Sequence, residues 1–234
     1  MSRFAICLLL LALTGSPAAA RGTGDLGLFI ERASSSAPII ETSTNTSIGR
    51  VSELGDLSHA SVVYSRDARF AYVFGRDGGL SKIDILNAEI NARILQSGNS
   101  IGGAISQDGR LVAVSNYEPG GVKVFDADTL ALIADIPATF GDNQQRSKVI
   151  GLVDAPENKF VFSLWDADEI WVLDMSNPSS PKIEKFRDIG RNPYDALITS
   201  DGRYYLAGLF GEDGMAMLDL WNLDSGITRI LPNY

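Results

Sequence analysis

His59 is the residue of this chain best suited to bind a metal or to move a proton. It is the single histidine among 234 residues. It lies in the run Asp56–Val63, at the start of an apolar stretch that is typical of a strand. An imidazole is a common iron ligand, and it changes protonation close to neutral pH. Because a lone histidine is often incidental, a chemical role requires other functional side chains to converge on the same place.

The elements around His59 are organised as repeats. Similar turn-and-strand segments occur at 65–73, 106–114, 155–163 and 199–207, and their starts are 41, 49 and 44 residues apart. An aspartate follows each segment start by 19 or 20 positions and closes another apolar strand: Asp84, Asp126, Asp174 and Asp219. We expect these aspartates to cap turns by accepting hydrogen bonds from backbone amides.

Each repeat is predicted to form four short strands. An Asp-Gly-Arg type of turn joins the first strand to the second, and a glycine-rich turn such as Asp77–Gly79 joins the second to the third. Helical periodicity is absent. Four strands per unit at a spacing of about 40–45 residues are typical of a β-propeller blade. The chain is therefore predicted to be all-β and built from propeller blades.

Residues 21–57 are predicted to form an incomplete blade ahead of four complete blades in residues 58–234. Leu26–Glu31, Pro38–Thr42 and Ile48–Leu54 match the second, third and fourth strands of a blade, and its first strand is missing. Propellers often close when the C-terminus supplies such a strand. Here the chain stops directly after the last predicted strand, so we expect an open arc rather than a closed five-bladed ring.

Residues 1–20 have the pattern of a secretory signal peptide: Arg3, the apolar run Ile6–Leu13, and small residues before Arg21. The apolar run is too short to span a bilayer, so no transmembrane segment is expected. Cleavage would remove Arg3 and Cys7, leaving a chain without cysteine and changing the net charge from −9 to −10. An exported chain without disulfides must be stabilised by its core, and we expect a periplasmic location.

The charge balance and the motifs exclude several classes of ligand. An acidic chain without a basic stripe repels phosphate backbones, so nucleic acid is not an expected partner. A single histidine and no cluster of ligands exclude a structural or hydrolytic zinc site. Residues Gly22–Gly27 match the G-x-G-x-x-G fingerprint. That motif binds nucleotides only between a strand and a helix, and a strand is predicted to follow it here.

The propeller is predicted to bring functional side chains to the level of His59, because the first strand of each blade lines the central channel. Counting back from the turn segments gives Asn99–Ser100, Lys148 and Asn192–Pro193 as equivalents of His59, with Arg146 and Arg191 just upstream. The turns after the second strands carry Arg76–Asp77, Asn116–Glu118, Trp165–Asp166 and Phe210–Glu212. If these positions share one mouth, they suit a flat aromatic ligand that carries carboxylates and a central metal.

Five longer runs resemble a known family: Gly55–Ala60, Tyr72–Gly79, Gly151–Pro156, Phe162–Trp171 and Ala207–Met215. They are similar to the NirF family of haem d1 biosynthesis proteins, which is related to the d1-haem domain of cytochrome cd1 nitrite reductase. The resemblance covers essentially the whole chain after residue 20. It implies an eight-bladed propeller in the periplasm of a denitrifying bacterium. That propeller would bind haem d1 or a late iron-tetrapyrrole precursor and take part in its maturation. Four blades and three strands are little more than half of such a ring, so we expect a C-terminally truncated or fragmentary chain.

The resemblance also implies roles for individual residues. His59 matches the histidine that binds the d1-haem iron axially in the reductase domain, and it would be the axial ligand or a proton donor. Arg76 matches an arginine that contacts the carboxylates of the ring. Asp154 follows an inner strand and is a second candidate acid or base. The remaining candidates for cofactor binding are Asn116, Tyr117, Arg146, Lys148 and Arg191.

Structural alternatives stay open for several of these residues. Arg76 could form a salt bridge with Asp77 or with a neighbouring blade. Arg146, Lys148 and Arg191 could be solvated charges on loops. Trp165 could stack on a ligand or simply pack between blades, whereas Trp171 is expected in the core.

Three functions stay open as well. The first is an enzyme that modifies the side chains of the tetrapyrrole, such as a dehydrogenase or another oxidoreductase. The second is a non-catalytic carrier or scaffold that delivers haem d1 to nitrite reductase, with other haem d1 maturation proteins as further partners. The third is a general interaction propeller. Nitrite reductase activity itself is not expected, because the chain has no C-x-x-C-H motif for covalent haem.

Overall fold

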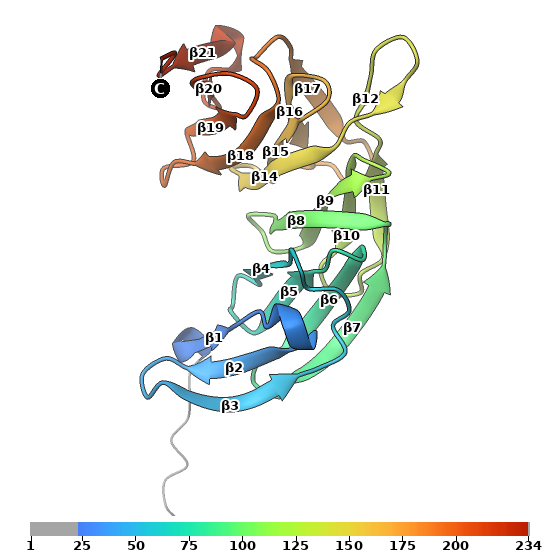
Figure 1. Cartoon of the computed structure of the whole chain (residues 1–234), viewed down its shortest axis with the longest axis vertical. Helices are drawn as coiled ribbons and strands as arrows, with labels where there is room; N and C mark the ends of the chain where they lie inside the picture. Colours follow the sequence, from blue (N-terminus) through green and yellow to red (C-terminus); the bar gives the residue numbers. More distant parts are fainter. Residues whose placement is uncertain (1–22, 234) are drawn as a thin grey trace, which may run out of the picture.

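The computed structural model describes residues 23–233, in which antiparallel β-sheets follow one another along the chain (Figure 1). The predicted signal peptide lies outside the described residues. Within them there is no α-helix; the helical pieces are the short 3-10 turns Thr23–Asp25, Arg32–Ser34 and Leu223–Ser225. No helix between residues 23 and 233 is long and apolar enough to cross a membrane.

We number the sheets as blades 1 to 5 in chain order. Blade 1 has three strands: β1 (Leu26–Leu28), β2 (Ala37–Glu41) and β3 (Thr46–Val51). Blade 2 consists of β4 (Ser61–Tyr64), β5 (Phe70–Phe74), β6 (Gly79–Asp84) and β7 (Glu89–Leu95), and blade 3 of β8 (Asn99–Ile105), β9 (Leu111–Glu118), β10 (Val122–Asp126) and β11 (Leu132–Ile136). Blade 4 consists of β14 (Val149–Ala155), β15 (Lys159–Leu164), β16 (Glu169–Asp174) and β17 (Lys182–Phe186), and blade 5 of β18 (Pro193–Ile198), β19 (Tyr204–Leu209), β20 (Met215–Asp219) and β21 (Ile227–Ile230).

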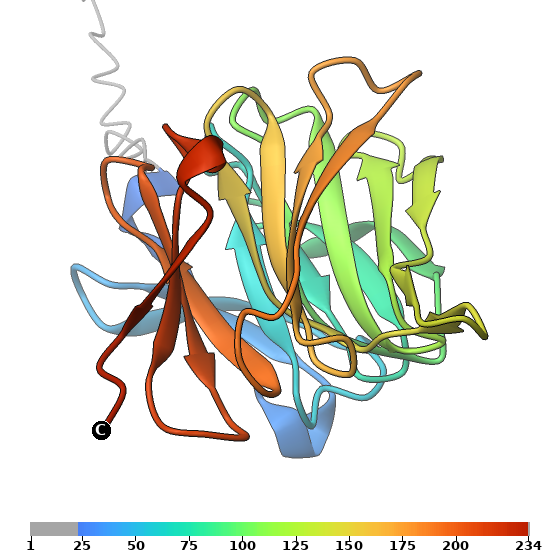
Figure 2. The ribbon, with the colours of Figure 1, turned by 90° about the horizontal axis from the view of Figure 1, so that it is seen from above.

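The blades form an open arc, and the predicted propeller architecture is confirmed (Figure 1). In each of blades 2 to 5 the strands lie in sequence order, so the first and fourth strands are the two edges of the sheet. The first strands are neighbours along the inner side of the arc: β4 contacts β8, β8 contacts β14, and β14 contacts β18. Figure 2 shows the strands running from one rim of the arc to the other.

Three details differ from the sequence-based expectation, and one is that β3 begins at Thr46 and ends at Val51 rather than spanning Ile48–Leu54. Strand β1 ends at Leu28 rather than at Glu31, because the chain leaves the ladder and forms a tight loop closed by pairing of Glu31 with Ser36. A short hairpin, β12 (Thr139–Phe140) with β13 (Gln145–Arg146), was not predicted; it lies between blades 3 and 4. This insertion explains why the second and third repeats are 49 residues apart, the longest of the three spacings.

The repeated turns are held by side-chain hydrogen bonds. In three of the four turn segments a serine or threonine hydroxyl donates to an aspartate two residues later, with Oγ to Oδ1 distances of 2.6 Å for Ser65–Asp67, 2.7 Å for Ser106–Asp108 and 2.6 Å for Thr199–Asp201. Asp84, Asp126, Asp174 and Asp219 each accept the backbone amide two residues further on, at 2.8–3.1 Å. Their predicted role as turn caps is confirmed.

Buried tyrosines fasten neighbouring blades to one another. The hydroxyl of Tyr72 in blade 2 donates to the carbonyl of Ala127 in blade 3 at 2.7 Å. The hydroxyl of Tyr205 in blade 5 donates to the Gly151 carbonyl at 2.9 Å and lies 2.8 Å from Ser163 Oγ, both in blade 4. Burial, aided by the negative charge of Asp128, raises the pKa of Tyr72 to about 12, so its hydroxyl remains a donor. Apolar side chains from blades 2 and 3, such as Phe74 and Val114, pack in one cluster with Tyr72.

The Tyr205 hydroxyl is predicted to stabilise the contact between blades 4 and 5. Tyr205→Phe removes a buried hydroxyl that contacts the buried Ser163 Oγ and donates to the part-buried Gly151 carbonyl, so the free energy of unfolding should fall by about 1–3 kcal/mol. Chemical denaturation, monitored by circular dichroism, measures this free energy of unfolding. The matched control is Tyr204→Phe, whose hydroxyl makes no hydrogen bond within residues 23–233 and whose loss should change stability by less than about 0.5 kcal/mol. Equal effects of the two substitutions would contradict the role of Tyr205.

Candidate functional site

The turns that precede the first strands and those that follow the second strands lie at one end of the blades, which we call the His59 rim. The antiparallel registers show this directly. The opposed pairs are Ser61 and Phe74 in blade 2, Asn99 and Glu118 in blade 3, Val149 and Leu164 in blade 4, and Pro193 and Leu209 in blade 5. Side chains from four blades can therefore meet one ligand at this end.

His59 occupies an exposed turn directly before β4, beside the turn that carries Arg76. The Asp56 carboxylate accepts the Ser58 amide at 2.8 Å, and the Asp56 carbonyl accepts the Arg76 amide at 2.8 Å. Within residues 23–233 the His59 imidazole has no hydrogen-bond partner, and the Arg76 guanidinium has no carboxylate within 4 Å. An imidazole without a hydrogen-bond partner and a guanidinium outside ion-pair distance of any described carboxylate therefore lie exposed on neighbouring turns of the rim. The hydrogen bonds from Ser58 and, to a smaller extent, the Arg76 charge lower the pKa of Asp56.

Arg76 does not form the salt bridge with Asp77 that was the structural alternative to a role in ligand binding. The Asp77 carboxylate instead pairs with Arg93 of the outermost strand β7, at 2.7 Å from Nη2. It also accepts the Gly79 amide at 3.0 Å, which holds the glycine-rich turn. The neighbouring carboxylate is thus engaged inside its own blade and leaves the Arg76 charge available.

An aromatic cluster, formed by Trp165, Tyr194 and Phe210, joins blades 4 and 5 on the same rim. The ring centroids lie 5.4 Å apart for Trp165 and Tyr194, 5.3 Å for Trp165 and Phe210, and 5.7 Å for Tyr194 and Phe210. Phe210 is 73% exposed. Trp165 therefore packs between blades, and its cluster also presents an apolar surface at the rim, where a flat ring could stack.

Tyr117 of blade 3 connects this cluster to the charged residues. Its hydroxyl lies 3.0 Å from that of Tyr194. Burial, the hydrogen bond with Tyr194 and the negative charge of Asp195 raise the pKa of Tyr117, and the positive charge of Arg76 opposes them. Tyr117 is therefore a neutral phenol near neutral pH. The charges of Asp195 and Arg76 both act on it, so these side chains lie within electrostatic reach of one phenol.

Two other candidates are turned away from the rim surface. Asn116 is fully buried, and its amide exchanges hydrogen bonds with the Gln96 side chain, at 2.8 Å from Gln96 Nε2 to Asn116 Oδ1. Arg146 lies on the β12–β13 hairpin, where Nη2 is 3.6 Å from the carboxylate of Asp135 on the outermost strand β11. Neither side chain is directed to the place where His59 and Tyr117 lie.

Lys148 and Arg191 are on the rim but have carboxylate partners. Lys148 Nζ is 3.0 Å from Asp166 Oδ1, and the Lys148 amide also donates to that carboxylate at 2.9 Å. Arg191 Nε is 3.4 Å from Glu212, which also pairs with Arg229 at 2.6 Å. Arg191 is exposed and Lys148 is half-buried. Pairs that are open to solvent contribute little stability, so a ligand carboxylate could compete for both cations.

Asp154 lies at the opposite end of β14 from Lys148. It is opposite Phe160 in the ladder, five residues from Val149, a rise of about 17 Å along the strand. Its carboxylate pairs with Arg66 Nη2 at 2.7 Å and accepts a hydrogen bond from Gln107. Arg66 also donates to the carbonyl of Ile105 at 2.6 Å, so this network ties the inner strands of blades 2, 3 and 4 together. The structure does not bring Asp154 and His59 together.

A cavity of about 240 Å³, which we call the channel cavity, opens between the inner strands. The residues that matter for its chemistry are Ser61 of β4, Gly102 of β8, Ser115 of β9, Gly151 of β14 and Asp195 of β18. Ser61, Asp195 and Tyr194 were not predicted as site residues from the sequence. The glycines inside predicted strands were the available signal, because glycine within a strand often marks a bulge.

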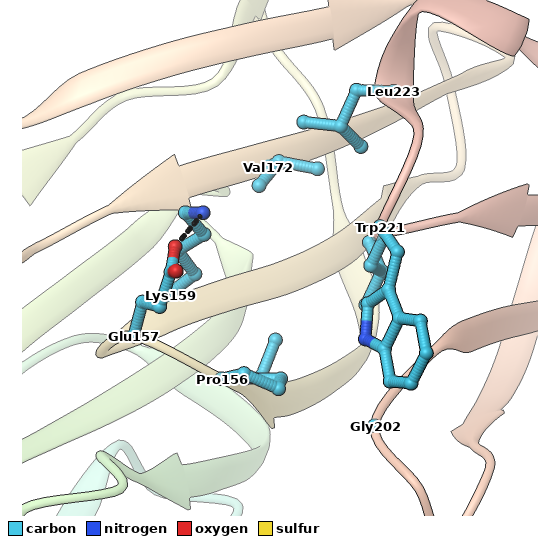
Figure 3. A pocket seen from close by; sticks show the side chains of 9 residues that line it. Pro156, Glu157, Lys159, Val172, Gly202, Trp221 and Leu223 are labelled. Carbon is cyan, nitrogen blue, oxygen red and sulfur yellow. Dashed lines mark hydrogen bonds and ion pairs between the residues drawn. The ribbon is translucent and has the colours of Figure 1, made fainter.

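A second cavity, of about 390 Å³, lies at the far rim between blades 4 and 5 (Figure 3). Pro156, Val172, Trp221 and Leu223 line it, and an ion pair of Lys159 Nζ with Glu157 Oε2, at 2.6 Å, borders it. The turn between β14 and β15 contributes Pro156, so this cavity belongs to the end opposite His59. None of its lining residues lies on the His59 rim.

Within residues 23–233 no group of three or more histidine, cysteine, aspartate or glutamate side chains is placed to hold a metal ion. A single imidazole can supply one ligand only. An iron ion bound at His59 would therefore need most of its ligands from another source, such as the four nitrogens of a tetrapyrrole.

Comparison with known proteins shows the family of this chain. The family model described as "Cytochrome D1 heme domain" matches residues 21–234. Protein NirF of Pseudomonas aeruginosa is 64% identical over 215 residues, which are 92% of this chain and 55% of that protein. The dihydro-heme d1 dehydrogenase of the same organism is 36% identical over 174 residues, 72% of this chain and 33% of that protein. The chain thus spans about half the length of the NirF protein that it matches.

Among solved structures, the dihydro-heme d1 dehydrogenase NirN in complex with DHE superposes with a TM-score of 0.78 and 29% sequence identity. The match covers 94% of this chain and 46% of that one. The resemblance to the NirF family is confirmed by these matches. From the family model that matches residues 21–234, we conclude that the chain belongs to the cytochrome D1 haem domain family.

Proposed function

We propose that this protein binds haem d1, or a late iron-containing precursor of it, on the His59 rim and acts in the maturation of the cofactor for cytochrome cd1 nitrite reductase. The observation that carries the proposal is the convergence on one rim of a free imidazole, a free guanidinium and an exposed aromatic cluster. The relatives named for NirF and for dihydro-heme d1 dehydrogenase support the same ligand class.

The residues present fit such a ligand. A tetrapyrrole iron needs an axial ligand, and His59 offers an imidazole without competing partners. The ring needs a flat apolar surface, which Phe210 and its neighbours in the aromatic cluster offer. Its carboxylates need cations, and Arg76 is unpaired in a chain whose net charge is −9.

The chain's own contribution is to bind and orient the ring and to handle protons. Arg76 would hold a carboxylate by charge-assisted hydrogen bonds. The aromatic cluster would cover one part of the macrocycle and exclude water there. One of the phenols of Tyr117 and Tyr194 donates to the other, so the pair would have one hydroxyl proton to donate to an acceptor on the ring. The redox chemistry would be supplied by the bound iron macrocycle.

We propose an enzymatic role in a late step of side-chain maturation, as an oxidoreductase. The identity to a dehydrogenase of dihydro-heme d1 supports this class of reaction. A second candidate is a non-catalytic carrier that hands haem d1 to nitrite reductase. The position of Asp154 favours the carrier, because this candidate acid or base lies away from the rim. Conversion of a precursor by the full-length protein would select the enzyme, and an unchanged bound ring would select the carrier.

We propose that the protein works in the periplasm. The pattern of residues 1–20, with one cation, a short apolar run and small residues, supports export. Fractionation of cells that express the tagged full-length protein tests the location. Recovery in the periplasmic fraction with residues 1–20 removed supports it, and recovery with the cytoplasmic markers contradicts it.

His59→Ala is expected to remove the axial iron ligand. The Soret band of the bound haem d1 should shift, and added imidazole should restore the original spectrum by entering the space left at residue 59. Spectrophotometric titration of the full-length protein measures both effects. An unchanged spectrum in the variant would remove His59 from the iron site.

Arg76→Ala is expected to weaken haem d1 binding by about 1–3 kcal/mol, because it removes a charged donor to a ring carboxylate. The matched control is Lys182→Ala on the outermost strand β17, which removes the same charge away from the rim and should leave affinity unchanged. Titration with a methyl-esterified ring separates the causes. An equal loss of affinity for the ester would contradict a carboxylate contact.

A further inference from the structure

One residue of the His59 rim, Asn192, is bonded to the backbones of two members of the aromatic cluster. Its side-chain Nδ2 donates to the carbonyl of Trp165 in blade 4 at 3.1 Å. Its own carbonyl accepts the amide of Phe210 in blade 5 at 3.0 Å. Tyr194, the third member, follows two residues later in β18. All three rings therefore leave a backbone that is fixed at Asn192 or directly beside it.

The conformation and the surroundings of residue 192 suit an asparagine. The backbone of Asn192 is left-handed, with a φ of 50°, and asparagine adopts this region more readily than most residues with a side chain. The Asn192 amide donates to Asp168 Oδ1 at 2.7 Å, which holds the turn against blade 4. A β-carbon at Gly211 would lie 2.7 Å from Asn192 Oδ1, so the glycine leaves the room that the Asn192 side chain occupies.

The bond from Asn192 to Trp165 has a counterpart between blades 2 and 3, where Ser100 Oγ donates to the carbonyl of Gly75 at 2.5 Å. Gly75 directly follows β5, as Trp165 directly follows β15. The bond thus ends on a glycine in one case and on a tryptophan of the aromatic cluster in the other. Both bonds fasten neighbouring blades, but only the bond to Trp165 also fixes where an aromatic ring leaves the backbone.

We propose that Asn192 is a positioning residue for ligand binding, which holds the aromatic cluster in its stacking arrangement before the ring of the ligand arrives. This inference rests on the proposed function. Phe210 is 73% exposed, so its place depends mainly on its backbone and on the two other rings. If Trp165 and Phe210 became ordered only when the ligand bound, the affinity would be lower by about tenfold.

Asn192→Gly tests this role, because glycine keeps the left-handed backbone and removes only the side-chain bond to Trp165. In the ligand-free full-length protein, the near-ultraviolet circular dichroism of the aromatic cluster should weaken. The affinity for haem d1, measured by spectrophotometric titration, should fall about tenfold. The Soret band of the bound ring should keep its wild-type position, because His59 is unchanged. The iron-free ring should lose affinity by the same factor, since stacking does not require the metal.

The matched control is Asn158→Gly. Asn158 also has a left-handed backbone, with a φ of 56°, and its Nδ2 also bonds a neighbouring blade, at 3.0 Å from Asp108 Oδ2. It lies in the turn between β14 and β15, at the end of the blades opposite His59. Its substitution should lower the free energy of unfolding, measured by chemical denaturation. It should change neither the affinity for haem d1 nor the near-ultraviolet signal of the aromatic cluster.

Wild-type affinity for haem d1 in folded Asn192→Gly overturns the positioning role and leaves the proposed function intact. An equal loss of affinity in Asn158→Gly also overturns it, because the cause is then a general loosening of the blades. Should Asn192→Gly not fold, Gly211→Ala displaces the Asn192 side chain from its other side and is expected to give the same loss. Wild-type affinity in Gly211→Ala then overturns the role. Failure of the wild-type protein to bind haem d1 contradicts both proposals.

Discussion

The candidate site depends on one constraint, the antiparallel pairing of each inner strand with the second strand of its blade. In such a pair the residue before the first strand and the residue after the second must lie at the same end. Repeated in four blades, the rule brings His59 and Phe210 to one rim although they are far apart in the sequence. The bonds between blades, such as that of Tyr205 to Gly151, then hold the blades beside one another.

Charge pairing decides which cations a ligand would meet first. Lys148 and Arg191 each have a carboxylate partner on the rim, whereas Arg76 has none among the described residues. Exposed pairs contribute only about 0–1 kcal/mol, so they could be exchanged for a ligand carboxylate at small cost. Arg76 needs no exchange, which makes it the best placed cation for an acidic ring.

The sequence was enough to predict the blades and the set of rim turns, because both follow from a repeat with fixed spacing. It did not predict how individual side chains are turned. The burial of Asn116 against Gln96 and the pairing of Asp154 with Arg66 join residues from different blades, so they depend on tertiary packing. The register shifts in three inner strands, β8, β14 and β18, were missed for a related reason. A glycine within a strand, such as Gly102, often marks a bulge, but only the neighbouring blades show that the irregularities surround one cavity.

The position of the ligand is the central claim, and tryptophan fluorescence tests it most directly. Trp165 lies in the aromatic cluster on the His59 rim, and Trp221 lies beside the far-rim cavity and is 62% exposed. Haem d1 bound on the His59 rim should quench the wild-type protein strongly. Trp165→Phe should lower that quenching more than Trp221→Phe does, because energy transfer to the ring falls steeply with distance and Trp165 is the nearer of the two. Quenching that disappears with Trp221 and persists without Trp165 would place the ligand at the opposite rim and contradict this account.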